Sequence, residues 1–584
     1  MPEMENKLDG EGRAEEVVRS LLAARLGGPD RVPQVLVDAV AFGKGDREAV
    51  RRATVAACGT DQPFDLVRFD TDRIYGYVYE SSRPPVIAGA SRILSDLNQR
   101  IHATYPYWTL FSGGGEGLLL APQGKGDAIR EEIERQYASA TADALSVTTD
   151  HLPVGPHDLI PSGPETAAAD GVRLVTGAQA MLARLYDRIR RKKDESARLG
   201  AGVPGREPRC ISCRDRAGTL PLPVKRQDKE EEKGPLCVPC HQRWSVGKDI
   251  INGISFDELV ENLPWTGAKA RYLGFLYADG NSMAALFGRL RHLEDLCFFS
   301  AAVSSLFRGV KKRAEEMANR LLPGVLPEDR PFLSFLGGGD EVIWIAPAAV
   351  AVELADRLPC WIEEEVGRIS GLQERLAAYG VPSLTIGTGL LVCDRTYPVR
   401  YQLNLASQLQ KNAKGMFYRS EGRIESSIDF EMLTDSSPLS EELKTSRYVA
   451  YRTEEEGFLR TCRPYTAGGF SVLVDRMRTA RARMASSQLH ALQSGAMEGR
   501  RVFLNALRYQ IAREPVGQKY RDWLERLGAE WRDPEEVQRF FLHDLPPDEQ
   551  GAPQAGTWIA DGLQLAPFLD QLKTLDEPPA RTVT

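Results

Sequence analysis

The sequence lacks long apolar segments and has few cysteines, and each absence excludes a class of protein. No stretch approaches the roughly 18 apolar residues that a membrane-spanning helix needs. The polar, acidic start, MPEMENKLDGEGRAEE, does not have the pattern of a signal peptide. Nine cysteines in 584 residues are an odd number and too few for a disulfide scaffold. We therefore predict a soluble protein of the reducing cytoplasm.

The chain also lacks an excess of positive charge. Lys and Arg number 74 against 81 Asp and Glu, so the net charge is −7. Such a chain does not coat nucleic acid over its whole surface, although a local basic groove stays open because electrostatics acts through patches. The length is enough for about four domains, and 42% hydrophobic residues are ordinary for a globular protein.

The most informative feature that is present is an internal duplication. FSGGGEGLLLAP at residues 111–122 resembles FLGGGDEVIWIAP at residues 335–347, since both place an acid after three glycines. Upstream, RFDTDRI at residues 68–74 resembles LYADGNSM at residues 276–283. The matched residues are Asp70 with Asp279, Asp72 with Asn281, Glu116 with Asp340 and Gly117 with Glu341.

Each copy alternates strand-like and helix-like segments in the order β–α–ββ–α. Aromatic and β-branched residues predict the strands, and apolar residues at steps of four, such as Ile129, Ile133 and Tyr137, predict a helix. This order is typical of a split βαβ, or ferredoxin-like, domain. The predicted fold class is therefore α+β, and the chain after residue 438 is expected to be mostly helical.

Three acids of the second copy fall at strand ends. Asp279 ends an apolar strand, and Asp340 and Glu341 follow a glycine turn between two further strands. In a split βαβ sheet these places can meet at one edge, where carboxylates would bind Mg²⁺ or Mn²⁺. Two such ions could activate a hydroxyl group and stabilise a leaving pyrophosphate. A glycine-rich turn with incidental surface acids is the alternative.

Residues around these acids form a candidate nucleotide-binding set. Glycines without side chains let a nucleotide approach the backbone amides closely, and lysines on a later helix could meet its phosphates. The set comprises Gly280, Asn281, Gly337, Gly338, Gly339, Lys411 and Lys414.

Two CxxC pairs predict a metal site of a different kind. Cys210, Cys213, Cys237 and Cys240 could supply four thiolates to a tetrahedral Zn²⁺. Four protein ligands leave no open position, so we expect the zinc to be structural, and His241 is expected to be a bystander. Four reduced thiols without metal are the alternative.

Four features together resemble a palm-type nucleotidyl cyclase domain: ADGNSM, GGGDEV, TIGTGLL and a helix ending in NAK. The order of two palms, a Cys₄ segment and a helical C-terminus more closely resembles the Cas-ten family, the Csm/Cmr large subunit of type III CRISPR effector complexes. The GGDD motif of that family reads GGDE here, at residues 338–341.

The resemblance implies that the second palm makes cyclic oligoadenylate from ATP when target RNA is bound. Asp279, Asp340 and Glu341 would be the catalytic, metal-binding residues. The implied partners are the other type III effector subunits, guide RNA and target RNA. The basic run at residues 188–193 is either a contact for RNA or a partner, or a solvated helix face. Fewer than about seventy residues precede the first palm, too few for the nuclease domain of many relatives, so DNA cleavage is not expected.

Two other functions stay open. One is a non-catalytic scaffold subunit of an RNA-guided complex, and the other is a stand-alone cyclase that makes a cyclic dinucleotide. The predicted domains are an N-terminal helical segment (1–60), a degenerate first palm (61–150), a helical linker with a zinc ribbon (151–265), the GGDE palm (266–435) and a helical C-terminal domain (436–584).

Overall fold

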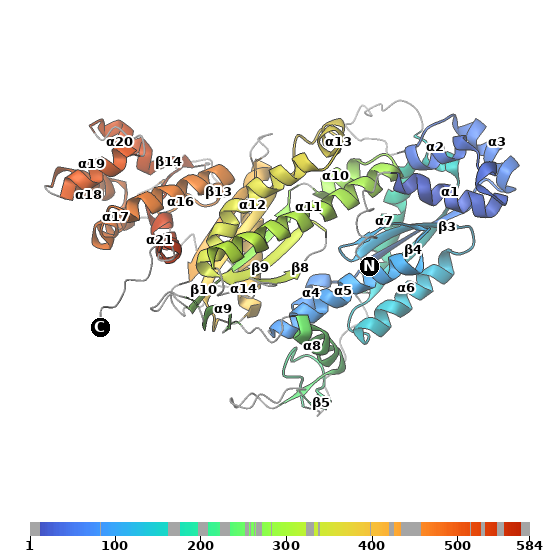
Figure 1. Ribbon diagram of the computed structural model, residues 1–584, viewed down its shortest axis with the longest axis horizontal. Helices are drawn as coiled ribbons and strands as arrows, with labels where there is room; N and C mark the ends of the chain where they lie inside the picture. The colour runs from blue at the N-terminus through green and yellow to red at the C-terminus, as the bar shows by residue number, and fades with distance from the viewer. Residues whose placement is uncertain are drawn as a thin grey trace.

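The computed structural model describes most of the chain (Figure 1). The described residues are 12–81, 83–161, 176–196, 208–221, 234–250, 256, 258–261, 263, 271–281, 283–322, 332–336, 339–397, 399–419, 425–433, 457–513, 516–526, 532–545 and 554–573. Among them, no helix combines the length and the apolar character needed to cross a membrane.

The first palm is a four-stranded antiparallel sheet in the order β2-β3-β1-β4. This order, with one helix after β1 and another after β3, is the ferredoxin-like arrangement predicted from the sequence. Its elements are β1 (Phe64–Thr71), α4 (Ile74–Val78), α5 (Pro84–Thr104), β2 (Thr109–Gly113), β3 (Glu116–Pro122), α6 (Gly126–Thr141) and β4 (Val147–Val154).

The second palm repeats the same order, β10-β7-β9-β8, and extends it by two strands beyond β10. Strand β11 is parallel to β10, and β13 is antiparallel to β11. The elements are β7 (Tyr272–Gly280), α10 (Met283–Arg289), α11 (Leu293–Leu321), β8 (Leu333–Leu336), β9 (Glu341–Pro347), α12 (Ala348–Arg368), α13 (Leu372–Ala378), β10 (Ile386–Asp394), α14 (Val399–Arg419), β11 (Ser427–Leu433) and β13 (Tyr465–Thr466).

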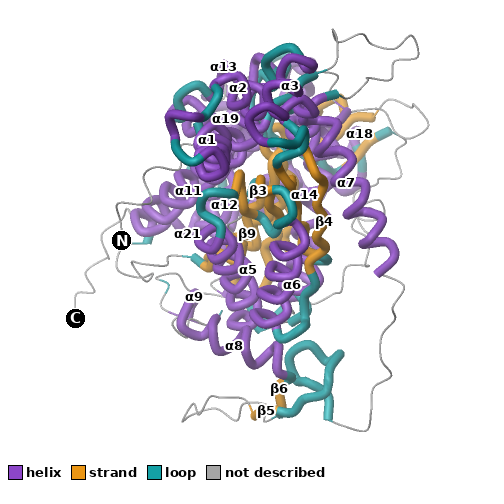
Figure 2. Tube along the Cα trace, turned by 90° about the vertical axis from the view of Figure 1, so that its right-hand side faces the viewer, coloured by secondary structure: helices purple, strands orange, loops and turns teal. Residues whose placement is uncertain are grey.

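The two palms pack in a reciprocal way. Side chains alternate between the two faces of a strand, and helices α5 and α6 cover the first-palm face that carries Val67 and Phe69. Helices α11 and α12 cover the second-palm face that carries Leu276 and Ala278. In addition, α5 packs against β8 and α11 packs against β2, so each palm lays its first long helix on the other sheet. Figure 2 shows the strands in the centre with helices on both sides.

The remaining face of each sheet is covered by the helix that follows its fourth strand. Helix α7 (Gly177–Ser196) lies on β4 and β1, and α14 lies on β10 and β7. This second level of correspondence, which the sequence comparison did not include, places α7 and α14 in equivalent positions.

Helices at the N-terminus join the first palm to the second. They are α1 (Arg13–Leu26), α2 (Gln34–Phe42) and α3 (Arg47–Cys58), with short 3₁₀ turns at Pro29–Arg31 and Pro156–Leu159. The Glu294 carboxylate of α11 accepts hydrogen bonds from the backbone N–H groups of Gly12 and Ala14, the latter at 2.9 Å. An acid at a helix N-terminus satisfies unpaired donors and complements the helix dipole.

The C-terminal region is mainly helical, as predicted, but it also contains a three-stranded sheet in the order β12-β15-β14. The sequence analysis missed this sheet because its strands are only two to four residues long. The elements are β12 (Phe458–Leu459), α16 (Ala467–Arg481), α17 (Ser486–Glu498), α18 (Arg500–Ala512), α19 (Val516–Arg526), α20 (Pro534–Phe541), β14 (Leu542–Leu545), β15 (Gln554–Thr557) and α21 (Ile559–Lys573).

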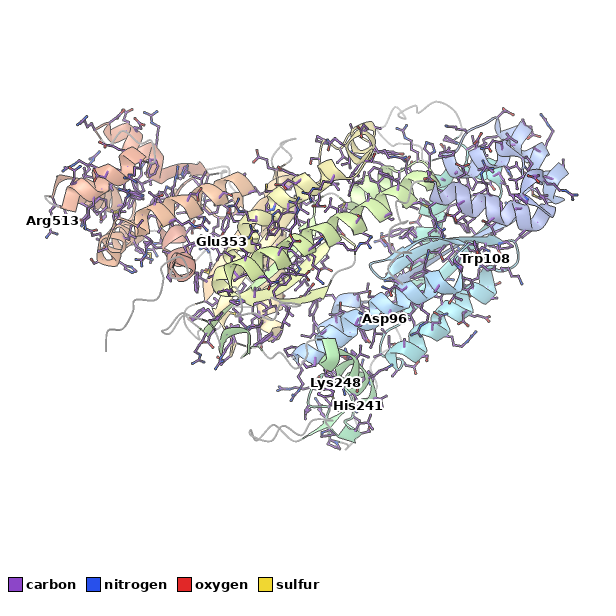
Figure 3. The ribbon with its side chains drawn as sticks, in the orientation of Figure 1. Asp96, Trp108, His241, Lys248, Glu353 and Arg513 are labelled. Carbon is purple, nitrogen blue, oxygen red and sulfur yellow. The ribbon has the colours of Figure 1, made fainter. Side chains whose placement is uncertain are left out.

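Two polar contacts fix this region to the second palm. Glu353 of α12, labelled in Figure 3, pairs with Arg478 of α16. Asp561 of α21 is fully buried and accepts hydrogen bonds from the Cys462 backbone at 2.8 Å and the Tyr465 hydroxyl at 2.6 Å. Because Tyr465 belongs to β13, the C-terminal helices are attached to the edge of the second-palm sheet.

Candidate functional site

The structure brings Asp279 and Asp340 together at the end of β7. The backbone N–H of Gly280 donates to the Asp340 carbonyl at 3.1 Å, which fixes the turn before β9 against the strand end. Burial raises the pKa of the Asp340 carboxyl to about 7, and the adjacent Asp279 carboxylate adds to the rise. Lys414 of α14 donates to Asp279 Oδ2 at 2.5 Å. The two carboxylates therefore repel each other, and the Lys414 ammonium group partly offsets this repulsion.

Glu341 lies directly opposite Asp279 in the β7–β9 register, but its carboxylate accepts a hydrogen bond from the Tyr277 hydroxyl. Burial raises the pKa of Glu341, and the Tyr277 hydrogen bond offsets part of that rise. Among the described residues, only the four cysteines form a group of three or more ligand atoms within 4.8 Å of one another. In the described structure Asp279 and Asp340 therefore lie together, and the Glu341 carboxylate lies apart from them.

The predicted nucleotide-binding residues divide into three groups. Gly339 has φ +75°, a left-handed conformation that favours glycine, whereas Gly337 and Gly338 lie outside the described residues. Asn281 donates to Thr385 Oγ1 at 2.9 Å, and its Oδ1 is buried without a hydrogen-bond partner. Of the two lysines, Lys414 reaches the acids and Lys411 is exposed on α14.

Sequence reasoning missed the role of Gly387 in this site. Gly387 lies opposite Asp279 in the β10–β7 register. A Cβ at this position would be 2.6 Å from Lys414 Cγ and 3.3 Å from Asn281 Oδ1, so only glycine lets Lys414 pass over the strand to Asp279. The TIGTGLL motif contained the signal, but its contact with Lys414 depends on the packing of α14.

Strand register corrects the matching of the two glycine turns. The Thr71 N–H donates to Gly115 O at 2.9 Å, as the Gly280 N–H donates to Asp340 O. Asp70 is opposite Glu116, as Asp279 is opposite Glu341. Glu116 therefore corresponds to Glu341, and matching it with Asp340 was wrong by one residue. In the first palm the place of Asp340 is taken by Gly115.

In the first palm, tethered cations neutralise the acids. Lys193 Nζ lies 2.9 Å from Asp70 Oδ1 and 3.2 Å from Asp72 Oδ1, and Arg68 pairs with Glu116 at 2.6 Å. Lys193 comes from α7 as Lys414 comes from α14, so each palm has a lysine beside the aspartate that ends its first strand.

The basic run at residues 188–193 is largely paired within the chain. Arg188 and Lys192 lie 2.8 and 3.3 Å from the buried Asp150 carboxylate, and Lys193 holds the first-palm acids. Arg190 and Arg191 are exposed. Only these two arginines fit the expectation of a solvated basic face.

The two glycine turns face each other across the interface between the palms. A Cβ built on Gly114 would lie 3.9 Å from Gly339 Cα. Nearby, Tyr75 and Tyr79 of the segment around α4 lie against each other, with ring centroids 4.6 Å apart and ring planes tilted by 54°. Burial raises the pKa of Tyr79 well above its usual range, and the Glu341 charge adds to the rise. The first palm therefore forms one wall of the second-palm site.

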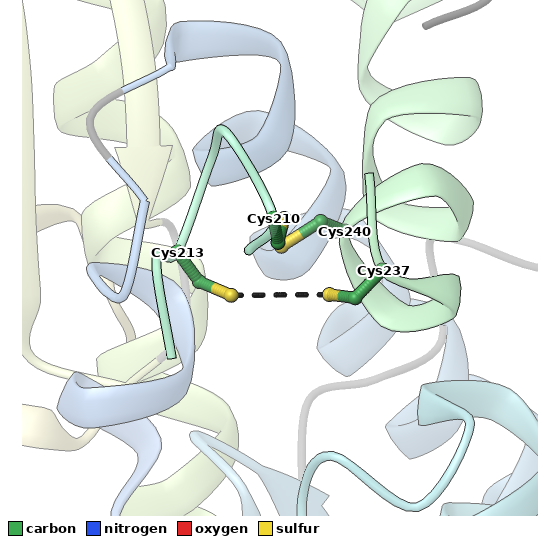
Figure 4. Close-up of side chains that lie close together, drawn as sticks. All are labelled: Cys210, Cys213, Cys237 and Cys240. Atoms are coloured by element: carbon green, nitrogen blue, oxygen red, sulfur yellow. Dashed lines mark hydrogen bonds between the residues drawn. The ribbon is translucent and has the colours of Figure 1, made fainter. Parts of the chain in front are cut away.

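The four predicted zinc ligands meet in one buried cluster (Figure 4). Cys213 Sγ and Cys237 Sγ are 3.8 Å apart, and a tetrahedron of Zn–S bonds of about 2.3 Å has edges of about 3.8 Å. The donor set therefore fits a structural metal ion. His241, labelled in Figure 3, is not part of the cluster.

A buried arginine ties this cluster to the first palm. Arg243 of α8 (Val238–Ile250) donates to Cys240 Sγ at 3.1 Å, to Tyr77 O at 2.6 Å and to Glu80 at 2.7 Å. Helix α8 packs closely on α5, where a Cβ at Gly89 would lie 1.8 Å from Arg243 O. The Cys₄ unit also includes β5 (Leu220–Pro221) and β6 (Pro235–Leu236), and it thereby supports α4, whereas α9 (Glu258–Glu261) contacts β9 of the second palm.

Two reciprocally packed ferredoxin-like palms with a Cys₄ unit define the class of protein, and solved structures of the same class exist. This is the fold of Csm1, which confirms the expected resemblance. A Csm1–Csm4 cassette in complex with AMPPNP matches with a TM-score of 0.51 and 16% identity, covering 92% of this chain and 72% of that chain.

Two further cassettes match equally well, each at 16% identity with a TM-score of 0.50. The complex with cA4 covers 87% of this chain and 70% of that chain, and the complex with pppApA covers 89% and 71%. No protein-family model matches the sequence, and no curated protein is similar to it. At 16% identity, the likeness to these solved structures establishes the fold alone.

The Cys₄ cluster generates a prediction about metal content. The wild-type chain should contain about one zinc ion, and Cys237→Ser should lose it and unfold at a lower temperature, because three thiolates no longer complete the tetrahedron. Elemental analysis and thermal unfolding measure both. Cys360→Ser, which changes an exposed thiol, is the control. A metal-free wild type of equal stability would contradict the assignment.

The acid pair generates a prediction about pH. Folded Asp340 keeps its proton up to about pH 7, whereas the unfolded chain releases it near its usual value of 3.8. Its contribution to stability is thus present below about pH 4 and is lost as the pH rises to 7. In metal-free buffer, Asp340→Asn should become progressively more stable than the wild type across this window, by at most about 1.4 kcal/mol per pH unit. Urea unfolding at several pH values measures the difference, and a pH-independent difference would refute it.

Proposed function

We propose that this chain is the large subunit of a type III CRISPR effector complex and that its second palm makes cyclic oligoadenylate from ATP. The observation that carries the proposal is the Asp279–Asp340 pair, which lies beside Lys414 at the palm–palm interface. The similar cassettes were solved with AMPPNP, cA4 and pppApA, which are a nucleotide and oligoadenylate species.

The donor set fits Mg²⁺ or Mn²⁺. Burial, together with the neighbouring Asp279 carboxylate, raises the pKa of Asp340 to about 7, and a divalent cation between the two carboxylates would favour their charged forms. Asp279 and Asp340 would hold the ion, with Glu341 as the third ligand once it is free of Tyr277. When bound, the metal supplies charge neutralisation at the reacting phosphate and its hydroxyl nucleophile.

The chain's own residues would position the two nucleotides. The reaction joins the 3′-hydroxyl of one ATP to the α-phosphate of the next, and pyrophosphate leaves. Lys414 is placed to share its charge between Asp279 and a phosphate, and the glycine turns at Gly114 and Gly339 allow close approach of the substrates. The buried Asn281 Oδ1 would accept a hydrogen bond from a nucleotide donor. Such chemistry depends on positioning and electrostatics more than on a side-chain base.

The partners follow from the same proposal. The similar structures are cassettes of Csm1 with Csm4, so we propose a Csm4-like subunit as a neighbour, within a complex that carries guide RNA and binds target RNA. Zinc in the Cys₄ cluster would be structural. The exposed Arg190 and Arg191 are the members of the basic run that remain candidates for contact with RNA.

A scaffold subunit without turnover is the second candidate. The observation that favours it is the neutralised first palm, where Lys193 and Arg68 hold the acids. A scaffold has no need of a second-palm acid pair that Lys414 neutralises only in part, and this pair therefore favours the cyclase. A stand-alone cyclic-dinucleotide cyclase is less well supported, since the similar structures are two-protein cassettes.

The test is a product assay on the complex with its partner subunits, target RNA, ATP and Mg²⁺, with products identified by mass. Asp340→Ala should lower turnover by roughly 10²–10³, the cost of losing a comparable electrostatic stabiliser, without loss of RNA binding. Glu341→Ala and Glu116→Ala are a matched pair at equivalent positions, and only the first should impair turnover strongly.

Two results would overturn the proposal. Wild-type turnover by the Asp340→Ala complex would mean that this site is not the catalyst. A wild-type complex that makes no product with every partner and target RNA present would establish the scaffold.

A further inference from the structure

Glu341 is the acid whose position departs from the expected metal site. Strand pairing places it directly opposite Asp279, where a carboxylate could complete a three-acid site. Its side chain instead accepts a hydrogen bond from Tyr277. Because side chains alternate along a strand, Tyr277 and Asp279 share one face of β7, so the Glu341 carboxylate can meet either the Tyr277 hydroxyl or a cation held by Asp279.

The first palm closes the space behind Glu341. The Tyr79 side chain is only 5% exposed, and its hydroxyl is buried without a hydrogen-bond partner. Tyr75 lies beside Tyr79, with ring centroids 4.6 Å apart and ring planes tilted by 54°. The turn that precedes Glu341 also faces the first palm, since a Cβ built on Gly114 would lie 3.9 Å from Gly339 Cα. The wall that keeps the carboxylate on Tyr277 thus comes from the other palm.

We propose that Tyr277 is a positioning residue that holds Glu341 away from Asp279 and Asp340, with Tyr75 and Tyr79 of the first palm as its backing. The divalent-cation site then has two carboxylates in this state and gains the third when Tyr277 releases Glu341. The inference rests on the proposed function, since it concerns the same metal site.

Movement between the palms is the natural means of release. Tyr75 and Tyr79 are carried by the first palm, and Glu341 and Tyr277 by the second, so a small displacement at the interface changes the room available to the carboxylate. Packed interfaces respond to such shifts by moving between discrete arrangements. The third metal ligand is therefore coupled to the relative position of the palms.

The test measures Mn²⁺ binding to the full-length chain without nucleotide, from the free-ion signal in electron paramagnetic resonance. Tyr277→Phe removes the hydroxyl and frees Glu341, so Mn²⁺ should bind about tenfold more tightly, the scale of one hydrogen bond to a charged group. Adding Glu341→Gln to Tyr277→Phe should abolish the gain. Tyr520→Phe is the matched control, because it removes a tyrosine hydroxyl that donates to Gln488 O within the C-terminal helices, and it should leave the affinity unchanged.

A second comparison covers the case in which Tyr277→Phe does not fold. Glu341→Gln in the wild-type background should hardly change Mn²⁺ affinity, because Glu341 is not a ligand while Tyr277 holds it, whereas Asp340→Asn should weaken binding at least tenfold. The inference is overturned if Glu341→Gln weakens binding as much as Asp340→Asn does. It is also overturned if folded Tyr277→Phe fails to tighten binding or keeps its gain with Gln at position 341.

These outcomes are separable from those of the product assay. The binding experiment contains no ATP, RNA or partner subunit. A negative result in the binding experiment therefore does not decide the cyclase assay, and a complex that makes no product can still show the predicted tightening of Mn²⁺ binding.

Discussion

The reciprocal packing of the palms is the constraint on which the rest of the structure depends. Each palm lays its first long helix on the sheet of the other, α5 on β8 and α11 on β2. This exchange buries apolar surface on both sides and brings the two glycine turns face to face. The approach of the first-palm tyrosines to the second-palm site depends on it. Because the N-terminal helices reach α11 through Glu294, the packing is also held from outside the two sheets.

Much of this could be predicted from the sequence, because the decisive signals were local. Strand periodicity, the repeated glycine turn and the two CxxC pairs fixed the α+β class, the duplication and the Cys₄ cluster. The turn itself was matched one residue out of place. Glycines can be aligned by eye, but equivalence is set by hydrogen bonds such as Thr71 to Gly115, which belong to the strand register.

What could not be predicted depends on contacts between distant segments. In the sequence, Tyr277 is only an aromatic residue of a predicted strand. Its contact with Glu341 follows from the β7–β9 pairing, which places Glu341 opposite Asp279. Lys193 falls in a run of basic residues that looks like a solvated helix face, and its pairing with Asp70 requires α7 to lie across β1. The contacts of Arg243 are also between distant segments. Its hydrogen bonds to Cys240, Tyr77 and Glu80 join the Cys₄ unit to α4, the helix that carries Tyr75 and precedes Tyr79.

The difference between Asp340 in the second turn and Gly115 in the first has a consequence for how the two halves could diverge. In a symmetric homodimer, a substitution that changes one site changes both, because the same surface is used twice. Here the two palms are encoded separately within one chain. Asp340 could therefore enter one turn while glycine stayed in the other, and Lys193 could neutralise one set of acids without touching its counterpart. Because the two palms belong to one chain, they are free of the symmetry of a homodimer, and their interface presents two chemically unlike sides.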